Sequence, residues 1–442
     1  MSKITTLAEY ATIQGGYAYK STDFLKTGKF KVLKIKNIRF GYIDYSETDF
    51  ISNQLSKKTE EWKTKPKDIL ISMTGSGPNA PASLVGRVAR VGENEPISFI
   101  NQRIGRVVVN EKVDSDYIYY LLSQKSSQEY FVNNSTGSAN QVNINGNTIL
   151  SLEVPCISFE ESKKIAQILN AFDEKIRLNT QINQTLEQIA QALFKSWFVD
   201  FEPVHAKAQA LSDGLNLEQA ELAAMQAISG KTPEELTTLS QTQPDRYAEL
   251  AETAKAFPCE MVEVDGVEVP KEWEVKRIDE VIQKIPVGKK YSSKTAFSEG
   301  LVPILDQGRS GVIGYHNDKP GVKASIEDPI IVFANHTCYM RLISYDFSAI
   351  QNVFAFKGKE CNLYWLYLAT LGKQEFVEYK GHFPDFLIKE IIVPPEELTE
   401  LFGKYVKESF SKIFINDREN SNLAKIRDLL LPKLLNGGIQ NE

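Results

Sequence analysis

Apolar positions recur along two long segments with the spacing of an amphipathic helix, one at residues 158–200 and one at 396–436. The first stripe is Ile165, Ile168, Phe172, Ile176, Ile182, Leu186, Ile189, Leu193 and Trp197. The second stripe is Phe402, Val406, Phe410, Ile413, Leu423, Ile426, Leu430 and Leu434. Ser158 followed by Glu161 predicts a capping box at the first helix start. At about 1.5 Å per residue, each stripe predicts a rod of about 60 Å.

Short alternating segments such as "GRVARV" and "RIGRVVV" precede the first stripe and predict strands bounded by glycine and proline turns. The same mixture of strands and short helices is expected over residues 1–157 and again over 269–395. Residues 201–268 are rich in Ala, Glu and Gln, and we interpret them as a helical connection.

The two halves of the chain resemble each other. "KIRLN" at 175–179 matches "KIFIN" at 412–416, and "LEQIAQALF" from Leu186 matches "LAKIRDLLL" from Leu423 at the same offset of 237 residues. A repeat of this length predicts two equivalent structural units. The expected fold class is therefore α+β: two mixed α/β domains separated by two long antiparallel helices, with a pseudo-two-fold internal repeat.

An asparagine interrupts each apolar stripe near its centre. If the helices are antiparallel and partner numbers sum to 595, Asn179 meets Asn416, and such a buried polar pair fixes helix register at some cost in stability. The alternative is that both asparagines face solvent or a partner. Two domains held apart by a stiff rod suit a split DNA sequence, because DNA presents the same groove every ~34–36 Å.

Composition describes an ordinary globular protein, with 42% hydrophobic and 24% charged residues. The start of the chain does not resemble a signal peptide, no apolar run approaches the ~20 residues of a membrane span, and the four cysteines are scattered. A cytoplasmic protein with reduced thiols is expected. The net charge of −6 excludes a generic polycation. Residues 20–39 nevertheless hold seven basic residues against one acid, which indicates either a phosphate-binding patch or a solvated face.

Two further segments resemble a known family. "KIAQILNAFDEKIRLNTQINQTLEQIAQALFKSWFVDFEPV" (164–204) closely resembles the central conserved region of the specificity (S) subunits of type I restriction–modification enzymes. "VPKEWEVKRIDEV" (269–281) resembles the opening of their second target-recognition domain. The resemblance implies a first target-recognition domain (1–157), a first conserved helix (158–200), the connection (201–268), a second target-recognition domain (269–395) and a second conserved helix (396–436).

The same resemblance implies a non-catalytic adaptor. Each recognition domain would read one half of a bipartite double-stranded DNA target, and the helices would hold two adenine methyltransferase subunits. Two ATP-dependent motor and nuclease subunits would join a restricting complex. S-adenosylmethionine, ATP and magnesium would belong to these partners, with no cofactor or metal bound by this chain.

Catalytic motifs are absent from the sequence, which agrees with that role. There is no GxxxxGK[ST] loop and no GxGxxG fingerprint. The Asn-Pro-Pro-aromatic motif of adenine methyltransferases is also missing. His336 and Cys338 are spaced like metal ligands, but no further ligand residues lie beside them in the sequence.

Loop residues with paired donors and acceptors are the candidates for reading bases, because Arg suits guanine and Asn or Gln suits adenine. Lys and Arg are expected mainly at phosphates. In the first domain the candidates are Lys34, Lys36, Asn37, Arg39, Thr74, Ser76, Asn79, Ser138, Asn140 and Gln141. In the second domain they are Gln307, Arg309, Asn335, His336, Lys380 and His382.

The first long helix ends in an aromatic cluster, Phe194, Trp197, Phe198 and Phe201, which exceeds what one antiparallel helix can cover. We expect the surplus to pack on a methyltransferase subunit or the adjacent recognition domain, since aromatic anchors dominate many interfaces. The alternative is that these side chains close the chain's own core.

Two other functions compete with the adaptor. One is a stand-alone regulator that binds a bipartite DNA site, and the other is a scaffold that spaces two protein-binding domains. Salt dependence separates them, because phosphate contacts weaken steeply as salt rises.

Overall fold

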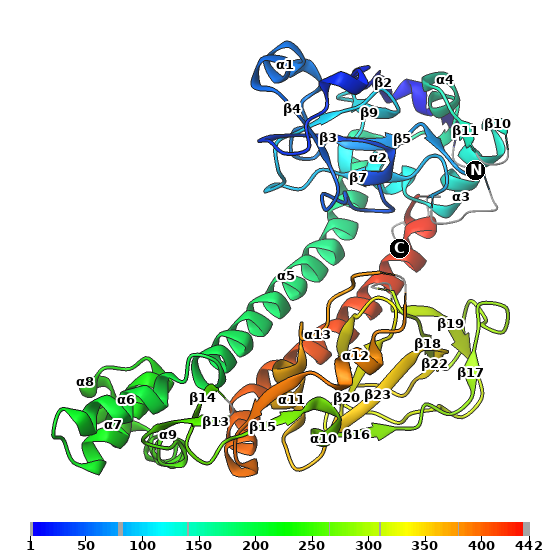
Figure 1. The fold of residues 1–442 in the computed structure, drawn as a ribbon. Helices are drawn as coiled ribbons and strands as arrows, with labels where there is room; N and C mark the ends of the chain where they lie inside the picture. The colour runs from blue at the N-terminus through cyan, green and yellow to red at the C-terminus, as the bar shows by residue number, and fades with distance from the viewer. Residues whose placement is uncertain are drawn as a thin grey trace. The chain divides into compact units, whose positions relative to one another are not determined.

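A computed structural model describes residues 3–77, 83–138, 141–264, 266–308, 311–378 and 380–435, with the side chain of Ser138 excepted. The chain divides into two compact units. Unit 1 comprises Met1–Leu178 and Glu419–Glu442, and unit 2 comprises Asn179–Arg418. Each unit contains one α/β domain and part of both long helices, α5 (Phe159–Phe198) and α13 (Glu396–Leu435) (Figure 1). No helix among the described residues is both long and apolar enough to cross a membrane.

The α/β domain of unit 1 is built on small sheets. The four-stranded sheet has the order β2 (Ala11–Gly15), β9 (Ile104–Val109), β5 (Ile69–Ser72), β7 (Val88–Arg90). One three-stranded sheet has the order β4 (Asp49–Ile51), β3 (Phe30–Leu33), β8 (Ser98–Ile100). Another has the order β10 (Thr136–Ser138), β11 (Gln141–Asn143), β6 (Thr74–Gly75). A two-stranded sheet pairs β1 (Ile4–Thr6) with β12 (Glu153–Pro155). The helices are α1 (Asn53–Lys58), α2 (Ser115–Leu122), α3 (Lys125–Asn133) and α4 (Gly146–Leu150). All four residues of β5 are buried, which makes this strand the centre of the domain.

The α/β domain of unit 2 repeats the four-stranded sheet and the two-stranded sheet of this plan. Its first four-stranded sheet has the order β16 (Ile282–Ile285), β23 (Val353–Gly358), β20 (Ile330–Ala334), β21 (Met340–Ile343). A second four-stranded sheet has the order β17 (Lys290–Tyr291), β22 (Ser348–Ile350), β18 (Val302–Leu305), β19 (Val312–His316). A two-stranded sheet pairs β15 (Glu274–Arg277) with β24 (Glu390–Val393). Its helices are α10 (Ile278–Val281), α11 (Leu363–Thr370) and α12 (Phe383–Leu387).

Strand pairing and helix capping confirm the internal repeat. In each unit the strand before the long helix pairs with a strand at the start of the domain, β12 with β1 and β24 with β15. The helices α2 and α11 are capped alike, because the backbone N–H of Asp114 donates to Ser162 Oγ and that of Asn362 donates to Thr399 Oγ1, both at 3.0 Å. Ser162 and Thr399 are 237 residues apart, which is the offset found in the sequence.

Four helices and a hairpin connect the two repeats inside unit 2. They are α6 (Glu202–Ser212), α7 (Leu217–Ser229), α8 (Pro233–Thr242) and α9 (Pro244–Ala256), followed by β13 (Met261–Val264) and β14 (Val267–Pro270). Lys207 is 2% exposed, and its ammonium donates to the carbonyls of Ala254 (3.1 Å) and Phe257 (2.6 Å). It therefore satisfies carbonyls at the C-terminal end of α9, where a positive charge is favoured. Burial lowers its pKa below the ordinary lysine value.

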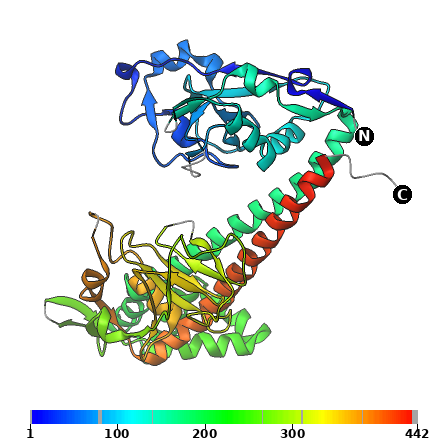
Figure 2. The same cartoon turned by 90° about the vertical axis from the view of Figure 1, so that its right-hand side faces the viewer.

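The long helices pair antiparallel, since residues early in α5 contact residues late in α13 within unit 1, and the reverse holds within unit 2 (Figure 2). Asn179 and Asn416 are both buried, at 1% and 0% exposure. The predicted contact of Asn179 with Asn416 stays a prediction, and the structure shows a partner of Asn416 one turn along α5, because Asn416 Nδ2 donates to Asn183 Oδ1 at 2.8 Å. Asn183 Nδ2 in turn donates to Asp417 Oδ1 at 2.8 Å.

The aromatic end of α5 packs inside unit 2, which confirms the expected packing on the adjacent domain and corrects the alternative of a methyltransferase interface. Trp197, Phe198 and Phe201 are 0%, 5% and 9% exposed, and Phe194 is partly buried in the same core. Phe402 of α13 contacts the rings of Phe194, Trp197 and Phe198. Trp197 also packs edge-on against Phe257 at the end of α9, and Phe198 packs on Trp273 and Trp365 of the α/β domain. The helical connection supplies the surface that a single antiparallel helix could not.

Charged side chains attach the α/β domain of unit 1 to the helices. Arg90 Nη1 donates to Asp116 Oδ1 (2.6 Å) and to Asn170 Oδ1 (3.1 Å) of α5. On the next turn Asp173 accepts from Tyr120 Oη (2.6 Å) and from Arg427 Nη1 of α13 (2.6 Å). Burial disfavours the charged form of Arg427, but hydrogen bonds to Asp173 and Asp428 outweigh it and raise its pKa.

Aromatic rings replace this network in unit 2. The position equivalent to Asp173 is Phe410, whose ring stacks on Tyr364 at 4.9 Å, and the position equivalent to Arg427 is Ala190. The two α/β domains therefore contact the same helical positions through different chemistry.

Candidate nucleic-acid interface

Three of the seven basic side chains in residues 20–39, those of Lys34, Lys36 and Arg39, form ion pairs with acids that follow the segment. Lys34 Nζ lies 2.5 Å from Asp49 Oδ2 and 3.7 Å from the ring centre of Phe24. Lys36 Nζ lies 3.1 Å from Glu47 Oε2, with side chains 49% and 80% exposed. An exposed pair of this kind contributes at most about 1 kcal/mol, so Lys36 can exchange its carboxylate for a DNA phosphate at little cost.

Asn37 holds a loop rather than presenting its amide outward, so its assignment as a DNA contact is corrected. It is 2% exposed. Its Nδ2 donates to the carbonyls of Asp44 (2.8 Å) and Glu47 (2.9 Å), and its Oδ1 accepts the N–H of Lys34 (2.8 Å). These three bonds use the hydrogen-bonding groups that would read adenine.

A tight turn follows, and it carries exposed aromatic residues that sequence reasoning missed. The N–H of Arg39 donates to the carbonyl of Tyr42 at 3.0 Å, and Gly41 has φ +82°, which favours glycine. Phe40 and Tyr42 are 50% and 59% exposed. Arg39 Nη2 lies 3.5 Å from Asp44 Oδ2, whose pKa is held low by hydrogen bonds from Ser46 and by the charge of Arg39. An arginine next to exposed aromatic residues suits contact with a DNA groove.

The sheet β10–β11–β6 brings the other two predicted segments of the first domain together. Thr74 pairs with Asn143, and its Oγ1 donates to Asn143 Oδ1 at 2.7 Å. Ser76 Oγ lies 2.9 Å from Ser83 Oγ. Both residues are buried, so they are corrected to structural roles, whereas Gln141 is exposed. Asn79, Asn140 and the side chain of Ser138 lie outside the described residues.

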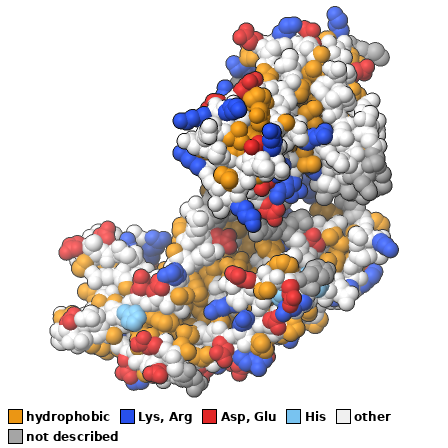
Figure 3. Space-filling model, turned by 45° about the horizontal axis from the view of Figure 1, so that its top comes forward, with side chains coloured by type: hydrophobic (Ala, Val, Ile, Leu, Met, Phe, Trp, Pro, Cys, Tyr) orange, Lys and Arg blue, Asp and Glu red, His pale blue; other side chains and the backbone are white. Residues whose placement is uncertain are grey.

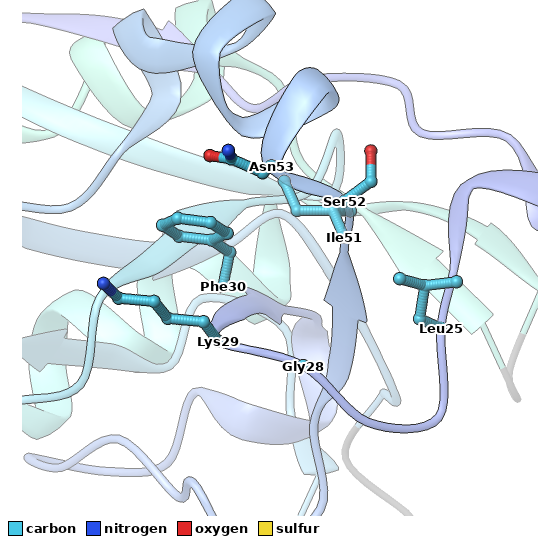
Figure 4. A pocket seen from close by; sticks show the side chains of 7 residues that line it. All are labelled: Leu25, Gly28, Lys29, Phe30, Ile51, Ser52 and Asn53. Atoms are coloured by element: carbon cyan, nitrogen blue, oxygen red, sulfur yellow. The ribbon is translucent and has the colours of Figure 1, made fainter.

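An open pocket of about 400 Å³ lies beside the basic segment. Figure 4 shows Lys29 and Phe30 on one side of it, Leu25 on the other and Asn53 at the start of α1. Its lining is mostly apolar, with Lys29 as its charged residue. It offers a concave face next to Lys29 and contains neither a carboxylate nor a thiol.

In the second domain the structure gathers all three predicted loops into one hydrogen-bonded cluster. Gln307 Oε1 accepts the N–H of His336 at 2.9 Å. His336 Nδ1 lies 2.7 Å from the carbonyl of Lys380, so Nδ1 must carry the proton. His336 Nε2 then accepts from Asn352 Nδ2 at 3.1 Å. The imidazole is therefore fixed between two loops.

Asn335 and His382 are buried within the same cluster, at 7% and 0% exposure. Asn335 Oδ1 accepts the N–H of Phe383 at 2.8 Å, and His382 Nε2 lies 2.9 Å from the carbonyl of Glu378. A Cβ at Gly381 would lie 2.8 Å from Asn335 Nδ2, so the loop approaches this closely only with glycine there. Asn335 and His382 are corrected from base-reading candidates to residues that shape the loop.

Lys380 remains a candidate because its side chain is 47% exposed. It lies 3.3 Å from Asp385 and 3.4 Å from Glu378, and the bond to Asp385 raises its pKa. Phe376 and Val377, which sequence reasoning missed, are 56% and 78% exposed on the same loop. Gln307 is half-exposed, and Arg309 lies outside the described residues.

The second domain contains a buried serine–histidine pair, and the position of the ring proton decides whether the histidine can activate the serine as a nucleophile. His316 Nε2 lies 2.9 Å from Ser348 Oγ, and both residues are buried. The backbone N–H of Asp318 donates to His316 Nδ1 at 3.0 Å, so the ring proton sits on Nε2 and points at the serine. His316 cannot act as a base toward Ser348 in this tautomer. The pair is structural.

Sequence comparisons identify the family. The model of the type I restriction modification DNA specificity domain matches residues 2–188. The HindI type I restriction enzyme specificity subunit of Haemophilus influenzae is 38% identical, over 96% of this chain and 95% of that protein. The chain belongs to the type I restriction enzyme specificity subunits. The MjaIX specificity subunit of Methanocaldococcus jannaschii is 26% identical over 77% of this chain and 73% of that protein. A crystal structure of a type I S subunit from M. genitalium aligns over 98% of this chain and 96% of that one, with 17% identity and a TM-score of 0.48.

Exposed apolar residues on the long helices of this specificity subunit recur at equivalent positions. In unit 1 they are Ile168, Leu178 and Ile426, exposed by 39%, 48% and 46% and here called the first apolar set. In unit 2 they are Tyr405, Ile415 and Ile189, exposed by 39%, 48% and 55% and called the second apolar set. Each residue of one set is 237 residues from its counterpart in the other.

This recurrence was not foreseen, because Ile168, Ile189 and Ile426 were expected inside the helix seam. Single exposed apolar residues are ordinary; Phe159 and Leu429 are exposed on the helices, and their counterparts are Glu396 and the small Ala192. Three pairs of exposed apolar residues at equivalent positions of the repeat are stronger evidence of a binding surface than single exposed residues. They favour two equivalent protein-binding surfaces on the specificity subunit.

Proposed function

We propose that this specificity subunit reads a bipartite DNA target, one half with each recognition domain, and holds one adenine methyltransferase subunit on each apolar set. The observation that supports this proposal most is that the two apolar sets occupy equivalent positions of the internal repeat. Two matched apolar surfaces on a repeated scaffold suit two copies of one partner, because the same patch chemistry is offered twice.

DNA contact is assigned to the loops of each domain. In the first domain we propose Lys36 at a phosphate, with Arg39, Phe40, Tyr42 and Gln141 at the groove. In the second we propose Lys380 at a phosphate, with Gln307, Phe376 and Val377 beside it. Basic and acidic side chains are interspersed on the face drawn in Figure 3, so on this face DNA contact would come from local loops.

Chemistry is assigned to the partners. The methyltransferase subunits would bind S-adenosylmethionine, and motor subunits of a restricting complex would bind ATP and magnesium. The chain itself would be a non-catalytic cytoplasmic adaptor. The serine–histidine pair supports this, since its tautomer prevents proton abstraction.

A methylation map tests the proposal. The chain is co-expressed with the methyltransferase subunit of the same system in a host without DNA methylation, and modified adenines are located by sequencing. We expect a split motif, methylated on both strands and lost when the chain is omitted. A soluble complex that leaves the DNA unmodified would refute the DNA-reading role.

Residue-level assignments are tested in the same host. Gln141→Ala is expected to relax one half of the motif only, and Gln307→Ala the other half only. Leu178→Asp and Ile415→Asp are each expected to remove one methyltransferase copy. A control substitution at the exposed Leu429, whose counterpart is only the small Ala192, is expected to leave the stoichiometry at two.

A further inference from the structure

The four-helix connection α6–α9 is strongly acidic. Residues 202–256 contain nine acidic residues against four basic ones, and one of the four, Lys207, is buried. Phosphates repel such a surface, so this element is not suited to face DNA. A protein surface rich in Lys and Arg is the partner that its charge fits.

Apolar side chains are exposed at one tip of this element. Leu211 at the end of α6, Leu215 in the turn and Leu217 at the start of α7 are exposed by 37%, 43% and 54%. The turn is ordered by Gly214 at φ +81° and by a hydrogen bond from the N–H of Leu215 to the carbonyl of Ala210 at 3.0 Å. The three leucines therefore sit in a defined conformation, which lowers the cost of binding a partner.

The internal core of the connection does not need these leucines. The buried residues of α7 are Ala220, Ala224, Met225 and Ile228, which face α6 and α9 in the unit 2 core. Exposed Asp213 and Glu218 flank the tip instead. An ordered apolar tip with an acidic rim has the anatomy of a protein-binding surface.

The connection also adjoins the second apolar set. Thr253 Oγ1 of α9 lies 3.5 Å from Tyr405 Oη, and the rings of Trp197 and Tyr405 are 5.2 Å apart. Figure 1 shows α6–α9 grouped beside the end of α5 in unit 2. The described residues of unit 1 include no equivalent of α6–α9 next to Ile168, the counterpart of Tyr405. The two apolar sets therefore have unequal surroundings.

We propose that the α6–α7 tip is an additional docking surface for the methyltransferase subunit held on the second apolar set. The face it fits is an apolar cleft bordered by Lys and Arg. This inference rests on the proposed function and deepens it, because it makes the two methyltransferase copies bind with different affinity. Assembly then passes through a complex that contains a single methyltransferase subunit.

Titration of the purified full-length chain with the methyltransferase subunit tests the inference, with stoichiometry read by native mass spectrometry and affinity by analytical ultracentrifugation. For the wild type we expect two steps that differ at least tenfold, with the one-copy complex populated first. In Leu215→Asp combined with Leu217→Asp, the tighter step weakens about tenfold, equivalent to ~1.4 kcal/mol, and the two steps become alike. Glu218→Lys is expected to weaken the same step.

Leu301→Asp is the matched control, since Leu301 is 84% exposed in the recognition domain of unit 2. It is expected to retain both steps of the wild type. Two equal steps in the wild type, or a tighter step unaffected by the tip variants, would overturn the inference and leave the proposed function standing. A wild type that binds no methyltransferase would overturn the proposed function itself.

Discussion

Replacing Arg427 by glutamine tests whether charge, rather than packing alone, holds the first recognition domain on the long helices. Arg427 Nη1 lies 2.6 Å from Asp173 Oδ1, and the two side chains are 27% and 21% exposed. Asp173 also accepts from Tyr120 Oη of α2, at 2.6 Å. The substitution leaves a partly buried carboxylate without its nearest cation.

The expected loss of stability is estimated from the distance between the charges of Arg427 and Asp173 and from their exposure. At 2.6 Å and an effective dielectric constant of ~20, the gross attraction is about 6 kcal/mol before desolvation is subtracted. Removing one partner of a fully buried pair costs roughly 3–5 kcal/mol. Water reaches both side chains here, and Arg90 Nη2 remains 3.9 Å from Asp173 Oδ2. We therefore expect a loss of about 2 kcal/mol in the free energy of opening of this domain.

A double-mutant cycle measures the interaction itself. Asp173→Asn, Arg427→Gln and the double variant are compared by native-state hydrogen exchange of the amides of α2, which reports the opening free energy. We expect a coupling energy of about 1.5 kcal/mol. The control pair is Glu174 with Arg177 on α5, exposed by 63% and 56%, for which coupling should stay below ~0.5 kcal/mol. A coupling for Asp173 and Arg427 no larger than the control would refute the reasoning.

Three further outcomes are expected. Lys207→Met should lower the free energy of unfolding of unit 2 by about 2 kcal/mol in thermal denaturation, because it leaves buried carbonyls at the end of α9 without a hydrogen-bond donor. Lys255→Met, a change at an exposed lysine, is the control and should alter the stability little. Burial lowers the pKa of His316, so the unfolded chain binds the proton more readily, and stability should fall as pH drops below about 6.5 toward the folded value. His316→Gln should flatten that part of the pH profile of the melting temperature, and an unchanged slope would contradict the assignment. Lys36→Ala and Lys380→Ala should each reduce the slope of log affinity for DNA against log salt by about 1, and a variant that keeps the wild-type slope does not touch a phosphate.

Periodicity was sufficient to predict the two long helices and the repeat, because amphipathic helices of this length leave a clear apolar stripe. It was not sufficient to predict the hydrogen-bond partner of Asn416. Moving one helix by four residues returns nearly the same face to its partner, so Asn179 and Asn183 are almost equivalent in the pattern. The structure selects Asn183 as a partner of Asn416, which periodicity alone could not decide.

The candidate DNA-contact residues show a different limit of prediction from sequence. Asn37, Asn335 and His382 have the side chains that read bases, but the same donors and acceptors also tie loops together. Sequence identifies the chemistry of such residues and not the direction in which they point. The exposed Phe40 and Tyr42 were missed for the converse reason, since aromatic residues are ordinarily assigned to a core. The Gly41 turn between them was the available signal.

The different attachment of the two recognition domains constrains how such a chain can acquire a new target by recombination. An incoming first domain must supply partners for Asn170, Asp173 and Arg427, and a mismatch leaves charge buried without compensation. An incoming second domain meets Phe402 and Phe410, where another apolar side chain of similar volume is tolerated. Exchanges at the second position should therefore yield folded hybrids more often. Over generations, one half of the target would diversify faster than the other.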